Sequence, residues 1–205
     1  MTPKFILASN SPRRREILSM LGIDFEVIVS ECDESIMPGT RPKDAVTELA
    51  RRKALAVLNQ SDKACNDVII IAADTVVSDK ERILGKPMDK EDAFHTLMSL
   101  SDKAHSVWTG IALIGIADAK TKIVTDAVET KVVFGKLSED EARFYVETGE
   151  PLDKAGSYGI QGIGGFFVTE LHGDYYNVVG LPIAALRELL MREFGLNACD
   201  YIGRR

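Results

Sequence analysis

Residues 68–77 read Val-Ile-Ile-Ile-Ala-Ala-Asp-Thr-Val-Val, and this stretch decides the fold class of the chain. A continuous run of β-branched and small apolar residues is typical of a strand that is buried on both faces of a sheet. Such a strand needs helices over both faces, and amphipathic helical patterns stand on either side of it in the sequence. The chain is therefore predicted to be an α/β protein built around this strand.

Strands and helices alternate along most of the chain. Apolar runs predict the strands, and helical periodicity with capping residues predicts the helices. The expected strands are 5–8, 25–29, 68–77, 105–117 and 122–134, and the expected helices are 12–21, 42–57, 89–100, 139–148 and 183–194. Only a short turn, 118–121, joins the last two strands, so these two must be antiparallel. The predicted fold is a mixed, twisted sheet flanked by helices.

Length and charge limit the classes of protein that this chain can form. Its 205 residues, 45% of them hydrophobic and 27% charged, suit one folded domain over 1–205. A net charge of −6 gives no overall attraction to nucleic acid or to an anionic membrane. Cys32, Cys65 and Cys199 form no C-x-x-C pair and no even disulfide set. We therefore expect a cytoplasmic protein without bulk nucleic acid or membrane partners.

Three consecutive arginines open the first predicted helix, directly after Ser11 and a proline. They are Arg13, Arg14 and Arg15. Cations are unfavourable at the positive end of a helix dipole, each by about 0.3 to 1 kcal/mol. A bound anion would compensate, because the first N–H groups of a helix, the arginines and the hydroxyl of Ser9 or Ser11 can all bind phosphate oxygens. Three solvated arginines are the alternative interpretation.

Two charged residues interrupt patterns that are otherwise apolar. Lys53 lies on the apolar stripe of the helix predicted over 42–57, where a lysine either extends its ammonium to water or meets a buried anion. Asp74 interrupts the buried strand over 68–77, where a carboxylate is costly unless a cation or a metal holds it. The alternative for Asp74 is a turn at the end of the strand, which the two following valines disfavour.

Three further segments carry weaker signals. Glu34 stands in an acidic loop that could bind a hard cation, although such loops are more often simply solvated. Lys86 reads on its own as an exposed loop lysine. Five glycines within 156–165 leave room for a ligand to approach the backbone. The amide of Gln161, inside this segment, can both donate and accept at a pyrimidine edge, but a turn-stabilising role is equally natural.

Several common catalytic motifs are missing from the sequence. It contains no P-loop, no dinucleotide-binding glycine motif after a strand, no serine-hydrolase elbow and no HExxH helix. The three histidines, His95, His105 and His172, have no metal-ligand spacing. Four large enzyme classes are therefore disfavoured.

Taken together, these segments resemble the Maf family of nucleoside triphosphate pyrophosphatases, whose fold is similar to that of inosine triphosphate pyrophosphatase. The resemblance rests on residues 7–14, 33–34, 53, 73–75, 85–87, 150–156 and 158–162, and so covers nearly the whole chain. It implies an elongated, two-lobed subunit with a central cleft across the mixed sheet, and a homodimer. It also implies hydrolysis of a nucleoside triphosphate between the α and β phosphates, assisted by Mg²⁺ or Mn²⁺, in the housecleaning of nucleotide pools.

The resemblance further implies a role for each residue singled out above. The family's catalytic aspartate matches Asp74, which would also bind the metal, and its metal-associated acid matches Glu34. Its phosphate-binding basic residues match Arg13, Lys53 and Lys86, with Lys53 and Lys86 expected to act in catalysis. Its loop lysine matches Lys154, and Ser9 and Ser11 are expected to bind substrate.

Within the family, the branch that acts on dTTP and UTP carries Arg, Thr and Gln at three specificity positions. Those positions are Arg14, Thr75 and Gln161, so the resemblance favours these two substrates. A rival interpretation is a nucleotide-sensing or protein-binding regulator without turnover, because the family name is tied to inhibition of septum formation in bacteria. A pure regulator would tolerate loss of the metal-binding carboxylates, whereas this chain keeps Glu34 and Asp74.

Overall fold

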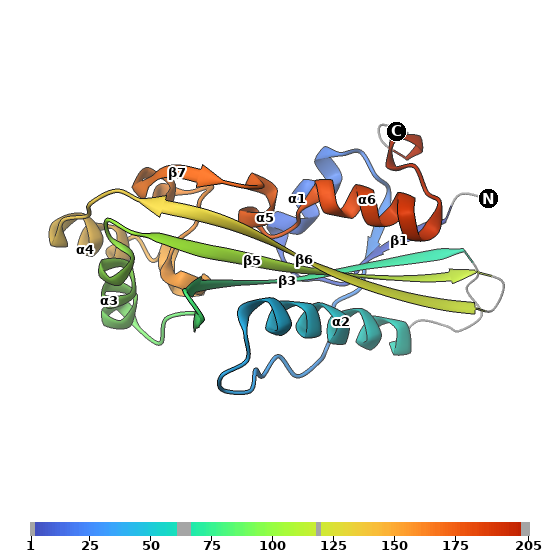
Figure 1. Ribbon diagram of the computed structural model, residues 1–205, viewed down its shortest axis with the longest axis horizontal. Helices are drawn as coiled ribbons and strands as arrows, with labels where there is room; N and C mark the ends of the chain where they lie inside the picture. The colour runs from blue at the N-terminus through green and yellow to red at the C-terminus, as the bar shows by residue number, and fades with distance from the viewer. Residues whose placement is uncertain (1–2, 61–66, 118–119, 202–205) are drawn as a thin grey trace.

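The computed structural model describes residues 3–60, 67–117 and 120–201 and shows an elongated molecule built on one twisted sheet (Figure 1). Over these residues the sheet has the strand order β2-β1-β3-β5-β6-β7, and β4 pairs with the end of β3. The strands are β1 (Lys4–Leu7), β2 (Phe25–Val27), β3 (Val68–Asp79), β4 (Arg82–Leu84), β5 (Ala104–Ala117), β6 (Lys120–Phe134) and β7 (Val168–His172).

The sheet is mixed, as predicted. β1 runs parallel to both β2 and β3, whereas β3, β5, β6 and β7 pair antiparallel in succession. β5 and β6 stay in register from Ala104 opposite Val133 to Ala117 opposite Lys120. They therefore form the long hairpin expected from the sequence, although part of its predicted turn, 118–119, lies outside the described residues.

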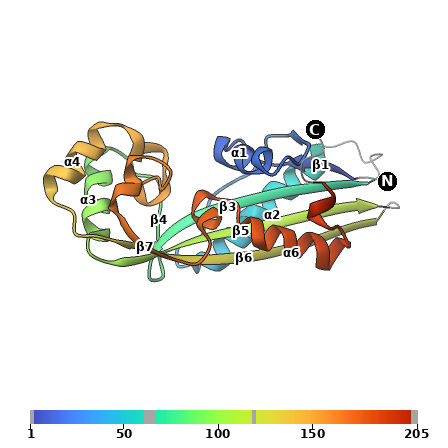
Figure 2. The same cartoon turned by 90° about the horizontal axis from the view of Figure 1, so that it is seen from above.

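Helices cover both faces of the sheet (Figures 1 and 2). The α-helices are α1 (Pro12–Met20), α2 (Pro42–Gln60), α3 (Lys90–Leu100), α4 (Glu139–Glu147), α5 (Tyr175–Val179) and α6 (Ile183–Phe194). Short 3₁₀ turns are η1 (Glu150–Asp153), η2 (Ala155–Ser157), η3 (Ile163–Phe167) and η4 (Ala198–Asp200). α2 lies on one face of the sheet, and α1, α5 and α6 lie on the other.

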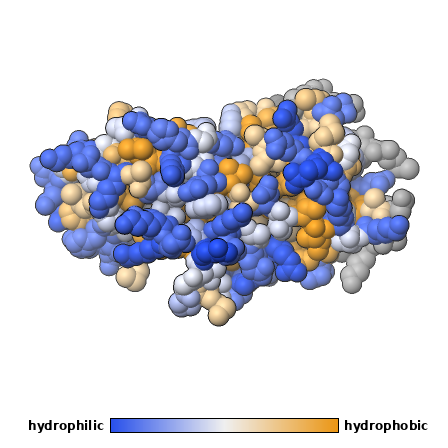
Figure 3. Space-filling model, in the orientation of Figure 1, coloured by the Kyte–Doolittle hydropathy of each residue, from blue (hydrophilic) through white to orange (hydrophobic). Residues whose placement is uncertain are grey.

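Side-chain alternation along β3 produces two cores, one on each face. Ile69 and Ile71 pack with α1 and α6, whereas Ile70 and Ala72 pack with α2. A third apolar cluster forms where α3 and α4 pack at the other end of the molecule, around Phe134. The elongated shape and the separate packing at its two ends agree with the two-lobed subunit expected. The outer surface seen in Figure 3 is mostly hydrophilic, with scattered hydrophobic patches.

The helices and strands predicted from the sequence all form, with ends shifted by a few residues. The N-terminal cap of α4 is the predicted capping box, in which Ser138 and Glu141 each bind the other's backbone. Sequence patterns missed β4, β7 and α5, which have three to five residues each and are too short for a periodic signal. Cys65 lies outside the described residues. No helix in the described part of the chain is long and apolar enough to cross a bilayer.

Candidate functional site

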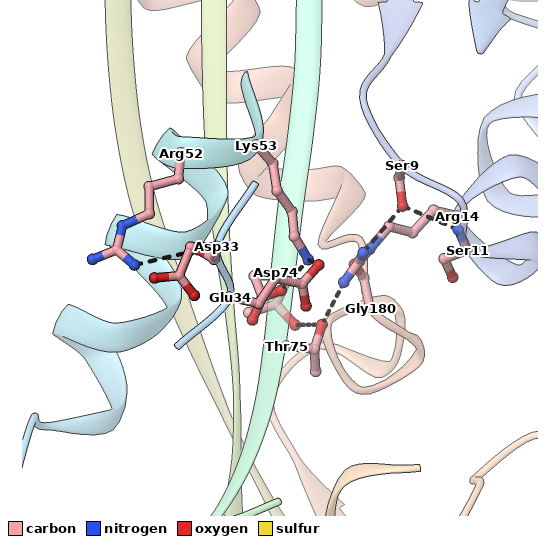
Figure 4. A network of polar contacts seen from close by, with 11 residues as sticks. Ser9, Ser11, Arg14, Asp33, Glu34, Arg52, Lys53, Asp74, Thr75 and Gly180 are labelled. Atoms are coloured by element: carbon pink, nitrogen blue, oxygen red, sulfur yellow. Dashed lines mark hydrogen bonds and ion pairs between the residues drawn. The ribbon is translucent and has the colours of Figure 1, made fainter. Parts of the chain in front are cut away.

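The two charged residues that interrupt apolar patterns bind each other. Lys53 Nζ lies 2.6 Å from Asp74 Oδ1, and both side chains are 10% exposed (Figure 4). Alternation along β3 places Asp74 on the face that packs against α2, and Lys53 lies on the buried side of that helix. Lys53 therefore meets a buried anion. Asp74 lies within the strand, not in a turn at its end, and the ammonium of Lys53 holds its carboxylate.

Glu34 adds a second carboxylate to the same ammonium. Its Oε1 lies 3.1 Å from Lys53 Nζ, but its side chain is 59% exposed. The loop that carries Glu34 is fixed from α2, because Arg52 donates to the backbone carbonyls of Asp33 and Ser35 at 3.4 and 3.1 Å. Lys53 thus has a buried carboxylate on one side and a solvent-facing carboxylate on the other.

Asp74 and Thr75 lie where one edge of β3 has no paired strand. The pairing with β1 ends at Ile71, and the pairing with β4 begins at Val77. Between these points, among the described residues, β3 pairs with β5 alone. Within this stretch Thr75 is partly exposed, whereas its neighbours Asp74 and Val76 are buried.

Arg14 organises the other face of the same stretch. Although it is one of three consecutive arginines, it is buried, and it donates three hydrogen bonds (Figure 4). Nε donates to Gly180 O at 2.8 Å, Nη1 to Ser9 Oγ at 3.2 Å and Nη2 to Thr75 Oγ1 at 3.1 Å. Burial lowers the pKa of Arg14 and the charge of Asp74 opposes this shift, but an arginine stays protonated in proteins. Solvation of all three arginines, one interpretation of the sequence, therefore does not hold for Arg14.

Ser9 is left with a free proton donor. Its Oγ accepts the backbone N–H of Ser11 at 3.2 Å as well as Arg14 Nη1, which uses both of its lone pairs. Ser11 stands at the N-cap of α1, but its side chain does not cap the helix. The hydroxyl of Ser9 can therefore donate to an acceptor such as a phosphate oxygen near the start of α1.

The remaining basic residues come from separate segments. Over the described residues, Arg13 and Lys86 make no hydrogen bond or ion pair. Lys154 Nζ donates to Glu150 O at 2.7 Å and to Asp153 Oδ1 at 2.6 Å. The hydrogen bond from Lys154, and then the charges of Lys154 and Arg13, hold the pKa of Asp153 below its usual value. Arg13 and Lys154, which are far apart in sequence, therefore act on the same carboxylate.

The glycine-rich segment is folded around the carboxylate of Glu150. Tyr145 Oη donates to Glu150 Oε1 at 2.8 Å, and the N–H groups of Ile163 and Gly164 donate to the two oxygens at 3.0 and 3.3 Å. Burial raises the pKa of Glu150, but these hydrogen bonds outweigh it and the net pKa is lowered. Gln161 is exposed on this segment and has no hydrogen bond within the described residues. The structure thus leaves its amide free, without bringing it into contact with Arg14 or Thr75.

The residues present fit a hard divalent cation only in part. No group of three or more His, Cys, Asp or Glu side chains within the described ranges is arranged to hold a metal. Glu34 and Asp74 do converge on one point, because both lie within 3.1 Å of Lys53 Nζ. Mg²⁺ is commonly held by one or two carboxylates together with water and substrate phosphates, so these two acids suit a cation that arrives with its ligand.

Three residues that no sequence pattern singled out hold the site together: Thr109, Asn177 and Gly180. Thr109 of β5 lies 2.9 Å from Thr75 Oγ1 and donates to the backbone carbonyl of Asn177 at 2.8 Å. Gly180 supplies the carbonyl that binds Arg14. Thr109 could have been noticed as a hydroxyl within the apolar run 105–117, but nothing in the sequence indicates its partners.

The fold and the site define an α/β protein with a buried lysine–aspartate pair on a central strand of its mixed sheet. The chain belongs to the Maf family, because the family model described as Maf-like protein matches residues 4–193. A dTTP/UTP pyrophosphatase of Bacillus anthracis is 51% identical over 187 residues, 91% of this chain and 94% of that protein. A dTTP/UTP pyrophosphatase of Bacillus cytotoxicus is 50% identical over 193 residues, 94% of this chain and 97% of that protein.

A solved structure also aligns with this chain. The Ham1 protein of Staphylococcus aureus aligns over 93% of this chain and 99% of that chain, with a TM-score of 0.47 and 18% sequence identity.

Proposed function

We propose that this protein hydrolyses nucleoside triphosphates, with dTTP and UTP preferred, between the α and β phosphates to give a nucleoside monophosphate and pyrophosphate. The Lys53–Asp74 pair at the open edge of β3 is the observation that carries the proposal. The names of the two Bacillus relatives support the choice of substrates. A regulator without turnover is not favoured, because it has no need for a buried carboxylate beside a lysine.

The chain's own residues divide between binding the phosphates and activating water. Arg13, Lys53, Lys86 and Lys154 provide positive charge for the phosphate oxygens and for the pyrophosphate leaving group. The free hydroxyl hydrogen of Ser9 donates to a phosphate oxygen, and so does the hydroxyl of Ser11, which does not cap α1. Asp74 orients the attacking water and takes its proton.

Glu34 and Asp74 would hold the divalent cation, Mg²⁺ or Mn²⁺. When bound, the cation supplies positive charge at the phosphate oxygens and makes a coordinated water more acidic. The Glu34 side chain is exposed and contacts Lys53, so it can turn toward a cation that enters with the substrate. Lys53 holds the Asp74 carboxylate in position when the cation is not there.

Arg14, Thr75 and Gln161 would select the base. Arg14 is already committed to three acceptors, so its part is to fix Thr75 and Ser9, while Thr75 and Gln161 face the pyrimidine. We further propose that the protein works as a homodimer in the cytoplasm and removes unwanted nucleotides from the cellular pool.

The products of a substrate panel test the proposal. Purified protein with Mg²⁺ or Mn²⁺ is given dTTP, UTP, CTP, GTP and ATP, and pyrophosphate and orthophosphate are measured separately. Pyrophosphate and a nucleoside monophosphate, formed fastest from dTTP and UTP, are expected. Orthophosphate as the first product, or no turnover of any triphosphate, would refute the proposal.

Two variants test the roles of single residues. Asp74→Asn should lose turnover, and Asp126→Asn, at an exposed position on β6, is its matched control. Gln161→Glu should weaken the preference for uracil while leaving cleavage intact.

A further inference from the structure

Thr109 links Asn177 to Thr75 through two hydrogen bonds, and chemistry fixes the direction of both. A backbone carbonyl only accepts, so the hydroxyl hydrogen of Thr109 must point to Asn177 O, 2.8 Å away. Thr109 then has no second hydrogen to give. In its 2.9 Å contact with Thr75, Thr109 is therefore the acceptor and Thr75 is the donor.

With these directions, the Thr75 hydroxyl has one unused lone pair and no free hydrogen to donate. Its hydrogen is given to Thr109, and one of its two lone pairs accepts Arg14 Nη2 at 3.1 Å. Thr75 is partly exposed, unlike its neighbours Asp74 and Val76. Because a Cβ at position 180 would lie 3.3 Å from Thr75 Oγ1, the glycine there keeps space open beside the hydroxyl. A ligand at this point thus meets an acceptor and must bring a donor.

The chain of hydrogen bonds is anchored at its far end and cannot easily reverse. The side-chain amide of Asn177 donates to Val107 O and to Thr130 Oγ1, both at 2.9 Å, which ties α5 to β5 and β6. Thr109 and Asn177 are completely buried, so neither can touch a ligand. Thr109 can therefore act on a ligand only through its two hydrogen-bond partners, the Thr75 hydroxyl and the backbone of α5 at Asn177.

We propose that Thr109 is a specificity-determining positioning residue that holds the Thr75 hydroxyl as an acceptor for the N3–H of uracil or thymine. Cytosine carries a lone pair at N3, so two acceptors would face each other and CTP is rejected. The proposal rests on the proposed function, and in particular on Thr75 facing the base. The hydrogen bond to Thr109 explains why the Thr75 hydroxyl accepts from a donor on the base, although a free hydroxyl can donate or accept.

Thr109→Val tests the proposal, with Thr109→Ser as the matched control. Valine keeps the shape of threonine but accepts no hydrogen bond, so the Thr75 hydrogen is released and can turn toward N3 of cytosine. The ratio of kcat/KM for CTP to that for UTP should rise about tenfold or more in Thr109→Val. It should stay at the wild-type value in Thr109→Ser, which keeps the hydroxyl. A purely structural role for Thr109 would lower both rates together and leave the ratio unchanged, which would overturn the proposal.

A second measurement uses the unaltered protein and so does not depend on the variant folding. The triphosphate of pyrimidin-2-one ribonucleoside has a lone pair at N3 and adds no bulk to the base. Wild-type protein should hydrolyse it about as poorly as CTP, and hydrolysis as fast as that of UTP would overturn the proposal. If wild-type protein hydrolyses no triphosphate, the proposed function itself fails. If it prefers UTP over CTP but neither test moves as expected, only the role of Thr109 fails.

Discussion

Lys53 of α2 and Asp74 of β3 stand 21 residues apart in the sequence, and Lys53 Nζ lies 2.6 Å from Asp74 Oδ1 on the face of the sheet that α2 covers. Each residue alone would be costly at its position, because a buried charge without a partner loses its hydration and gains nothing in return. Together they offset much of that cost. The two residues differ in their other contacts, because Lys53 also forms an ion pair with the carboxylate of Glu34.

This difference predicts unequal effects of removing either partner. Lys53→Met leaves a buried carboxylate without a cation and should lower the free energy of unfolding by about 3 to 5 kcal/mol. Asp74→Asn should cost clearly less, because the amide oxygen can still accept from Lys53 and Glu34 still neutralises the ammonium. Both variants should lose more than about nine-tenths of kcat/KM, a rise in the barrier of about 1.4 kcal/mol or more.

Denaturant unfolding of both single variants and of the double variant provides the measurement. The double variant should be more stable than the sum of the two single losses predicts, since the partners are in contact. Equal losses in the two single variants, or a Lys53→Met protein as stable as wild type, would contradict this account of the pair.

The sequence was sufficient to identify both members of the pair but not their contact. Helical periodicity placed Lys53 on a buried stripe, and the apolar run around Asp74 showed that its carboxylate was unusual. Their meeting depends on which face of β3 packs on α2, which is a property of the whole sheet. Arg14 shows the same limit, because the repeated arginines look equivalent until the fold buries one of them against Gly180.

Gly110 of β5 controls how closely α2 approaches the sheet. It lies directly opposite Asp74 in the register of β3 and β5, and a Cβ at this position would come within 2.2 Å of Val46 O. Because the obstacle is helix backbone, Gly110→Ala should force α2 outward, with a loss of about 1 to 3 kcal/mol or more in stability. The shift should also move Lys53 and reduce turnover.

Thermal melting and UTP hydrolysis measure the two effects. Gly85→Ala is the control for melting, since a Cβ there meets nothing within 4 Å. A Gly110→Ala protein that melts with wild type would show that α2 packs less tightly than the structure indicates.

Glu150 is expected to order the segment that carries Gln161. Its carboxylate accepts hydrogen bonds from three donors in the described residues. They are the hydroxyl of Tyr145 and the N–H groups of Ile163 and Gly164. In Glu150→Gln, the amide NH₂ would face one of these donors, so the substitution should cost about 1 to 3 kcal/mol. Limited proteolysis should then cut within 159–165 sooner than in wild type. Glu147→Gln, at the exposed end of α4, should leave the cutting rate unchanged.

His105 should give the protein a pH-dependent stability that is separate from the site. Its Nε2 lies 2.8 Å from Tyr158 Oη, its Nδ1 has no hydrogen-bond partner in the described part of the chain, and it is buried. Burial lowers the pKa of His105 to about 4, against a weaker opposing effect of Asp79. In the unfolded chain the imidazole has a pKa of about 6.5, so between these two values the unfolded state binds more protons.

The contribution of His105 to stability is therefore complete above about pH 6.5 and is lost as the pH falls toward about 4. The loss should approach about 1.4 kcal/mol per pH unit within this window. His105→Gln has an amide that can still bind Tyr158 but cannot take up the proton, so its unfolding free energy should fall less steeply over the same range. Urea unfolding of both proteins across the window measures the difference. His95→Gln, at an exposed position on α3, should follow the wild-type curve. If His105→Gln and wild type lose stability in parallel as the pH falls, the neutral imidazole of His105 is not what the folded state requires.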